Sequence, residues 1–85
     1  MKFRFSRHVL EELEKRKISQ KLVERVLYAP EQKVPEVGDI TCYQSRMEIS
    51  GKAYLLRVMV NETMNAALVV TMYRTSKISK YWRKP

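Results

Sequence analysis

The chain has 85 residues, enough for one domain (residues 1–85) with a small core, and its hydrophobic fraction of 45% excludes a disordered chain. Seventeen Lys and Arg against nine Asp and Glu give a net charge of +8, which favours nucleic acid or an acidic protein as partner. Cys42 is the single cysteine and His8 the single histidine, which excludes an intramolecular disulfide and metal sites built from Cys and His clusters. We therefore expect no metal and no cofactor. The lack of a long apolar run predicts a cytoplasmic protein with no membrane span.

The first third of the chain predicts a short strand followed by two helices. Apolar and basic residues alternate over residues 2–5, which indicates the strand. Ser6 is placed to cap a helix from Arg7 to about Lys17, and Ser19 to cap a second helix that Pro30 ends. Each predicted helix has an apolar stripe at helical spacing: Val9, Leu10 and Leu13 in the first, and Leu22, Val23, Val26 and Leu27 in the second.

The remainder of the chain predicts strands. Residues 31–39 have the composition of a polar connection, and from Ile40 the hydrophobic period changes to two. Ile40–Ile49 and Lys52–Val60 form a predicted hairpin around a Ser-Gly turn, and Ala66–Arg74 is the most apolar strand. The order of elements predicts an α+β fold, with two N-terminal helices packed on one face of an antiparallel sheet of three to four strands, followed by a basic C-terminal tail.

Strict alternation predicts the sheet face of each strand residue. On the strand from Lys52 to Val60 one set is almost wholly apolar and is assigned to the helix side: Tyr54, Leu56, Val58 and Val60. Arg57 then lies on the opposite face, and Arg46 and Tyr73 are expected to join it. The same count places Ala67 and Val69 on the face of Tyr73. An ordinary half-solvated sheet without any site explains the same pattern.

The last seventeen residues, 69–85, begin as an apolar strand and end as a basic, aromatic tail without Asp or Glu. Cations neutralise phosphates, and flat rings stack on unpaired bases. The composition therefore indicates binding of RNA or single-stranded DNA, with a solvated C-terminus as the alternative. The RNA-binding candidates are Arg74, Lys77, Lys80, Tyr81 and Trp82.

Four short motifs, in this order along the chain, resemble the DUF4258 family. They are S-x-H at Ser6–His8, R-x-I-S at residues 16–19, V-x-x-x-L-x-x-P at residues 23–30, and V-V-T-M-Y at Val69–Tyr73 before a basic segment. That family resembles the RelE/ParE toxin superfamily, which includes BrnT-like and HigB-like toxins. The resemblance implies two helices on an antiparallel sheet, and a toxin–antitoxin system with an acidic antitoxin as partner. Many members of the superfamily cleave messenger RNA at the ribosome, whereas ParE-like members poison gyrase.

Metal-free RNA cleavage uses the ribose 2′-hydroxyl as nucleophile and needs a base, an acid and cations around the phosphorus. RelE-type sites resemble this with Arg, Lys and Tyr. The resemblance implies that Arg57 and Arg46 hold the phosphate and that Tyr73 or Tyr81 stacks a base or transfers a proton. The alternative for Arg57 is a surface charge beside Glu48 or Glu62. The alternative for Tyr73 is a ring at the edge of the core.

His8 is a further catalytic candidate, because a neutral imidazole can act as a general base near neutral pH. Its position in the first helical turn favours a structural or capping role over a catalytic one, and a contact to RNA is the third alternative. Cys42 is expected to be a buried small side chain rather than a nucleophile, and Arg16 to pair with Glu12 one turn earlier.

The leading prediction from the sequence is therefore a toxin-like endoribonuclease that acts on messenger RNA, on or off the ribosome. A non-catalytic RNA-binding or ribosome-associated module on the same scaffold is the first alternative. A protein-interaction domain or gyrase-directed toxin, whose basic surface receives an acidic segment, is the second.

Overall fold

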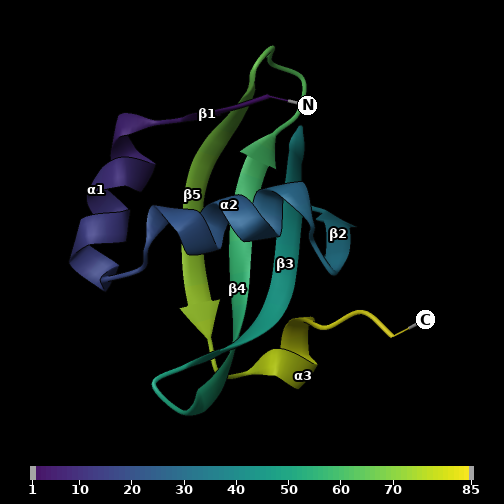
Figure 1. Ribbon diagram of the computed structural model, residues 1–85. Helices are drawn as coiled ribbons and strands as arrows, with labels where there is room; N and C mark the ends of the chain where they lie inside the picture. The colour runs from purple at the N-terminus through teal and green to yellow at the C-terminus, as the bar shows by residue number, and fades with distance from the viewer. Residues whose placement is uncertain (1, 85) are drawn as a thin grey trace.

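The computed structural model describes residues 2–84, which form an α+β fold with two helices on one face of a mixed sheet (Figure 1). The elements are β1 (Phe3–Phe5), α1 (Arg7–Arg16), α2 (Gln20–Tyr28), β2 (Gln32–Pro35), β3 (Ile40–Ile49), β4 (Lys52–Asn61), β5 (Ala67–Thr75) and α3 (Ile78–Tyr81). Within this part of the chain the sheet has five strands in the order β1-β5-β4-β3-β2. The prediction of three to four antiparallel strands was wrong, because β2 adds one edge strand and β1 pairs with β5 in parallel.

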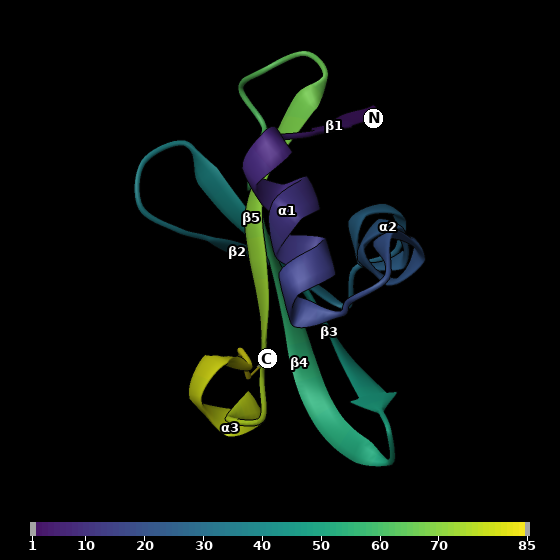
Figure 2. The same cartoon turned by 90° about the vertical axis from the view of Figure 1, so that its left-hand side faces the viewer.

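The two predicted serine caps are confirmed. Ser6 Oγ accepts a hydrogen bond from the N–H of Val9 at 3.1 Å, and Ser19 Oγ accepts one from the N–H of Leu22 at 3.2 Å. The first helix ends at Arg16, because Lys17 adopts a left-handed conformation with φ 53°. In Figures 1 and 2, α1 runs roughly along the strands while α2 crosses them, and both cover the same sheet face.

The hydrophobic core lies between these two helices and the sheet. The helices contribute Val9 and Leu13 from α1, and Val23, Val26 and Leu27 from α2. The sheet contributes Tyr43, Leu56, Val58, Val60, Ala67, Val69 and Met72. Each large aliphatic side chain buried here stabilises the fold by about 1.5–3 kcal/mol. The predicted helix-facing set of β4 is thus confirmed at its three aliphatic members.

A β-bulge in β5 changes the predicted faces of that strand. The pairing with β4 skips Val70, which leaves one extra residue on β5. Ala67 and Val69 therefore lie in the helix-side core, while Tyr73 lies on the opposite face. The prediction that all three share one face was wrong, because a slip of one residue reverses the faces of a strand.

The β3–β4 hairpin has the predicted turn, in which Ser50 and Gly51 both have positive φ, at 52° and 78°. The segment expected to be a polar connection contains β2, whose last residue, Pro35, lies on an edge strand, where a missing N–H is tolerated. Figure 2 shows α3 on the side of the sheet opposite α1 and α2. In the part of the chain that is described, no helix has the length and apolarity needed to span a membrane.

Candidate functional site

Four polar residues lie side by side across β2, β3, β4 and β5 on the face opposite α1 and α2. The strand register places Gln32 opposite Gln44, Gln44 opposite Arg57, and Arg57 opposite Tyr73. Gln44 Nε2 donates to Gln32 Oε1 at 2.8 Å, and Arg57 Nε donates to Gln44 Oε1 at 2.8 Å. Arg57 Nη1 donates to Tyr73 Oη at 2.5 Å. We call this continuous row of four hydrogen-bonded side chains the polar ladder.

Arg57 is the buried cation of the polar ladder, with 4% of its surface exposed. Besides its bonds to Gln44 and Tyr73, its Nη2 lies 3.4 Å from a carboxylate oxygen of Glu36. Its guanidinium carbon lies 4.4 Å from the ring centroid of Tyr81. Burial works against the charge, but the hydrogen bond to Tyr73 and the neighbouring acidic groups raise the pKa of Arg57 above its ordinary value. The site therefore holds a permanent, fully bonded positive charge.

The C-terminal tail folds back over the polar ladder. The backbone carbonyl of Tyr81 accepts a hydrogen bond from Gln44 Nε2 at 3.2 Å. Gln32 binds both backbone groups of Arg83, because its Nε2 donates to the carbonyl at 2.6 Å and its Oε1 accepts from the N–H at 3.1 Å. The ring of Trp82 lies 4.1 Å from the guanidinium carbon of Arg46. Two strands, β2 and β3, thus hold a tail segment of three residues.

The tail brings Tyr81 to Tyr73, with ring centroids 6.2 Å apart and ring planes at 73°. A hydrogen bond from Lys80 and its positive charge lower the pKa of Tyr81. Burial raises the pKa of Tyr73, although the hydrogen bond from Arg57 works in the other direction. Neighbouring groups with pKa values shifted in opposite directions suit a base and an acid, here Tyr81 and Tyr73 respectively.

The structure brings together three of the residues singled out from the sequence, Arg57, Tyr73 and Tyr81. Arg46 lies two residues further along β3 than Gln44, with Trp82 stacked on it, and pairs with Glu31 at 3.0 Å. More than half of the Arg46 side chain is exposed (54%), in contrast to buried Arg57. Arg46 thus lies at the rim of the site, beside the tail.

The structure does not bring His8 to this site. His8 is exposed on α1, in the helix layer, whereas Arg57 and the tail lie on the other face of the sheet (Figure 2). Arg16 pairs with Glu12 at 2.7 Å, as the sequence predicted. The glutamate beside Arg57 is Glu36, which the sequence did not single out.

Of the cationic candidates, Arg74 lies near the end of β5, Lys77 directly precedes α3 and Lys80 lies in α3. These elements and the β3–β4 hairpin lie at the same end of the molecule (Figure 1). In this hairpin the ring of Tyr54 has Lys52 Nζ at 5.6 Å and the guanidinium carbon of Arg74 at 5.0 Å. We call this part of the molecule, with Arg74, Lys77 and Lys80, the basic end. It also includes Tyr54 and Lys52, which the sequence did not mark as binding residues.

Gln32 and Gln44 are the site residues that sequence reasoning missed. Alternation along Ile40–Ile49 places Gln44 on the face of Arg46, but nothing in a lone glutamine indicates a hydrogen-bonding role. Gln32 stands in a segment with the composition of a loop, so its place in a strand beside Gln44 was hidden. The signal that could have found them is the shared face of Gln44 and Arg57, because a buried arginine needs acceptors nearby.

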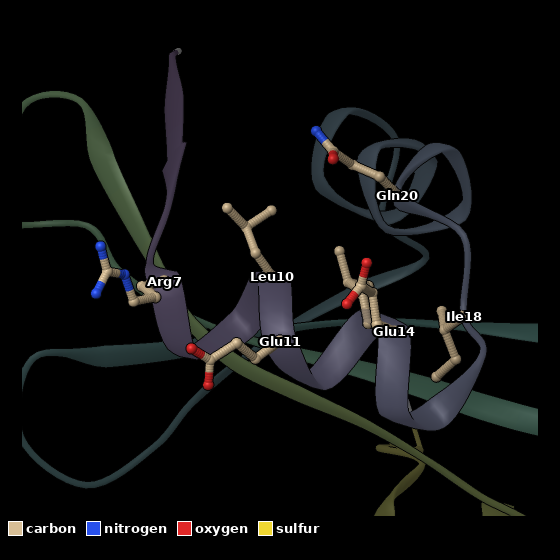
Figure 3. A pocket seen from close by; sticks show the side chains of 7 residues that line it. Arg7, Leu10, Glu11, Glu14, Ile18 and Gln20 are labelled. Carbon is tan, nitrogen blue, oxygen red and sulfur yellow. The ribbon is translucent and has the colours of Figure 1, made fainter.

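A separate cleft lies on the helix side, beside α1 and the start of α2 (Figure 3). Its lining mixes charged and apolar side chains: Arg7, Leu10, Glu11, Leu13, Glu14, Ile18 and Gln20. It shares no residue with the polar ladder. Among residues 2–84 no three His, Cys, Asp or Glu side chains gather in a way that could hold a metal ion. Cys42 is buried, and burial raises the pKa of its thiol to about 11.

The chain was compared with protein-family models, with curated proteins and with solved structures, and no match was found in any of the three comparisons.

Proposed function

We propose that this chain is a toxin-like endoribonuclease that cleaves messenger RNA without a metal, as the resemblance to the RelE/ParE superfamily implies. The observation that carries the proposal is the contact of Arg57 with both Tyr73 and Tyr81 (2.5 Å to the phenol oxygen of the first, 4.4 Å to the ring of the second). A buried cation between two phenols with opposite pKa shifts is an arrangement suited to proton transfer.

In this mechanism the Tyr81 phenolate takes the proton of a ribose 2′-hydroxyl, and the freed oxygen attacks the neighbouring phosphorus. A bond forms from the 2′-oxygen to phosphorus while the bond to the 5′-oxygen of the next nucleotide breaks. Tyr73 donates its proton to that leaving oxygen. The products are a 2′,3′-cyclic phosphate and a free 5′-hydroxyl, so protons and electron pairs balance.

The cations of the basic end hold the RNA backbone in this proposal. Lys80 directly precedes Tyr81 in the chain, and Lys77 lies four residues before Tyr81. Both lysines are exposed, so they can approach phosphate oxygens, and Arg74 adds charge near the end of β5. Arg57 is too deeply buried to bind the phosphate directly. Its role is to orient Tyr73 and to supply positive charge beneath the reacting groups. The excess of positive charge also suits an acidic antitoxin as partner.

A non-catalytic RNA-binding module is the second candidate, and one observation favours it. Every nitrogen of Arg57 already faces a protein acceptor, namely Gln44, Tyr73 or Glu36. If Lys77 and Lys80 cannot stabilise the negative charge of the phosphorane in place of Arg57, the same surface binds RNA without cleaving it.

The test is inducible expression in a bacterial host, with transcript ends mapped by primer extension. The informative variants are Tyr73→Phe and Tyr81→Phe, which each remove one hydroxyl, and the matched control is Tyr28→Phe, at an exposed tyrosine on α2. We expect growth arrest and discrete messenger cuts for the wild type and the control, and loss of both in the two site variants. Intact transcripts with salt-sensitive RNA binding by the purified protein would instead establish the second candidate.

A further inference from the structure

The sheet holds the backbone of the C-terminal tail through hydrogen bonds from two glutamines. None of the residues Ile78–Tyr81 is buried, so α3 adds no fully buried side chain that could anchor it. A four-residue helix has little stability of its own. The tail backbone is fixed by the hydrogen bonds of Gln32 to both backbone groups of Arg83 and of Gln44 to the carbonyl of Tyr81. The rings of Tyr81 and Trp82 add contacts with sheet side chains.

Gln32 binds the tail in the way a neighbouring β-strand would. Its amide donates to the Arg83 carbonyl and accepts from the Arg83 N–H, so one side chain satisfies the whole backbone of one residue. This contact does not depend on the Arg83 side chain. It fixes the position of the chain immediately after Tyr81 and Trp82.

Gln44 links this backbone contact to the charged centre. Its side chain is fully buried and makes three ladder or tail contacts: with Gln32, with the Tyr81 carbonyl and with Arg57 Nε. With the Gln44 carbonyl oxygen bound to Arg57, the amide nitrogen must point to Gln32 and the tail. The orientation of Arg57 and the docking of Tyr81 are therefore set by the same amide group.

We propose that Gln32 and Gln44 are positioning residues that clamp the tail and so hold Tyr81 against Arg57 and Tyr73. This inference rests on the proposed function, since it assigns Tyr81 to the reacting site only while the tail is docked. The tail is thus a part of the site that assembles on the sheet, and RNA meets a complete site only in the docked state.

The test uses Gln32→Ala, because Gln32 lies on an edge strand and its loss leaves the core intact, with Gln20→Ala on α2 as the matched control. Trp82 is the single tryptophan of the chain and lies in the clamped segment, so its fluorescence reports docking without any RNA. We expect Gln32→Ala to shift Trp82 emission to longer wavelength and to raise the pKa of Tyr81, measured by NMR, as it loses Tyr73 and Arg57 as neighbours.

Cleavage is measured on a single-stranded oligoribonucleotide with the same proteins. Gln32→Ala should lower the rate by about a hundredfold, the loss typical of a catalytic group misplaced by about 1 Å. Gln32→Glu keeps the acceptor for the Arg83 N–H but loses the donor to its carbonyl, and should fall between wild type and Gln32→Ala. Gln20→Ala should match the wild type.

Two results would contradict the proposed positioning role of Gln32 and Gln44. Unchanged Trp82 emission and an unchanged Tyr81 titration in Gln32→Ala would mean that Gln32 does not hold the tail. A shifted emission with faster cleavage or tighter RNA binding would mean that the tail covers the site instead of completing it. If the wild type does not cleave RNA, the proposed function fails, while the emission and titration still decide whether the clamp exists.

Discussion

Arg57 and Tyr73 face each other directly across β4 and β5, and the 2.5 Å bond between them is the shortest contact of the polar ladder. The two residues are sixteen positions apart in the chain, so only the strand register brings them together. The bond gives the buried guanidinium of Arg57 an acceptor and fixes the orientation of the Tyr73 phenol. Structural and chemical roles are therefore combined in Arg57.

Replacement of Arg57 by methionine should destabilise the fold by about 3 kcal/mol, because it leaves the fully buried Gln44 carbonyl and the Tyr73 phenol without their donor. The matched change, Arg46→Met, should cost much less, since Arg46 and Glu31 form an exposed pair that solvent screens. Urea unfolding followed by circular dichroism measures both. Equal losses for the two variants would contradict the structural role of Arg57.

If the proposed mechanism holds, the pH dependence of RNA cleavage should be bell-shaped. In that mechanism Tyr81 must lose its proton and Tyr73 must keep its own, so the rate should rise with pH through a value below the usual tyrosine pKa of 10 and fall through a value above 10. Lys80→Met removes the main cause of the lowered Tyr81 pKa and should move the rising limb to higher pH. Single-turnover rates on an oligoribonucleotide test this, and a rising limb that Lys80→Met leaves in place would exclude Tyr81 as the base.

Glu62 should make the fold sensitive to acid. Hydrogen bonds from Tyr43, from Lys33 at 2.9 Å and from Thr41 at 2.8 Å lower its pKa from 4.5 to about 2. Because the folded-state pKa lies below the unfolded one, ionised Glu62 stabilises the fold above pH 4.5, and this contribution is lost as the pH falls from 4.5 to about 2.

Glu62→Gln should therefore lower the free energy of unfolding at pH 7 by about 1–3 kcal/mol, and the difference from wild type should shrink between pH 4.5 and 2. Urea titrations across this pH range provide the measurement. Glu48→Gln, at an exposed glutamate of β3, is the control and should change stability by no more than about 0.5 kcal/mol. A constant difference at every pH would show that the Glu62 carboxylate is not the cause.

The Cys42 thiol should resist alkylation in the folded protein. It is fully buried, and burial raises its pKa to about 11, so at pH 8 it is both inaccessible and protonated. Mass spectrometry after iodoacetamide treatment should find the cysteine unmodified in buffer and fully modified in urea. Rapid labelling in buffer would mean that β2 and β3 open readily around it.

Strand and helix patterns were largely readable from the sequence, because serine caps, the Ser-Gly turn and alternating residues act locally. β3 lies where it was predicted, and β4 extends one residue beyond the prediction, to Asn61. β2 was hidden by the proline and glycine in its vicinity, which favour a connection. The Val70 bulge was hidden because the residues before it, Ala66 to Val69, are all apolar, so a slip of one position leaves their pattern unchanged.

The site was readable only in part. Arg57 and Tyr73 were marked from their shared face, and Tyr81 from the composition of the tail. Their meeting depends on where the tail turns after β5, and this is decided by side-chain hydrogen bonds from Gln32 and Gln44 rather than by any local propensity. His8, marked from the resemblance, lies in the other layer, since a motif in sequence does not determine which sheet face a helix covers.

The parallel pairing of β1 with β5 has a consequence for how the protein is made. Phe3 pairs with Ala67, which is synthesised 64 positions later. Contacts of such separation close late and slow folding. β1 must therefore wait, unpaired, until β5 has been synthesised, and this edge of the sheet is completed only then.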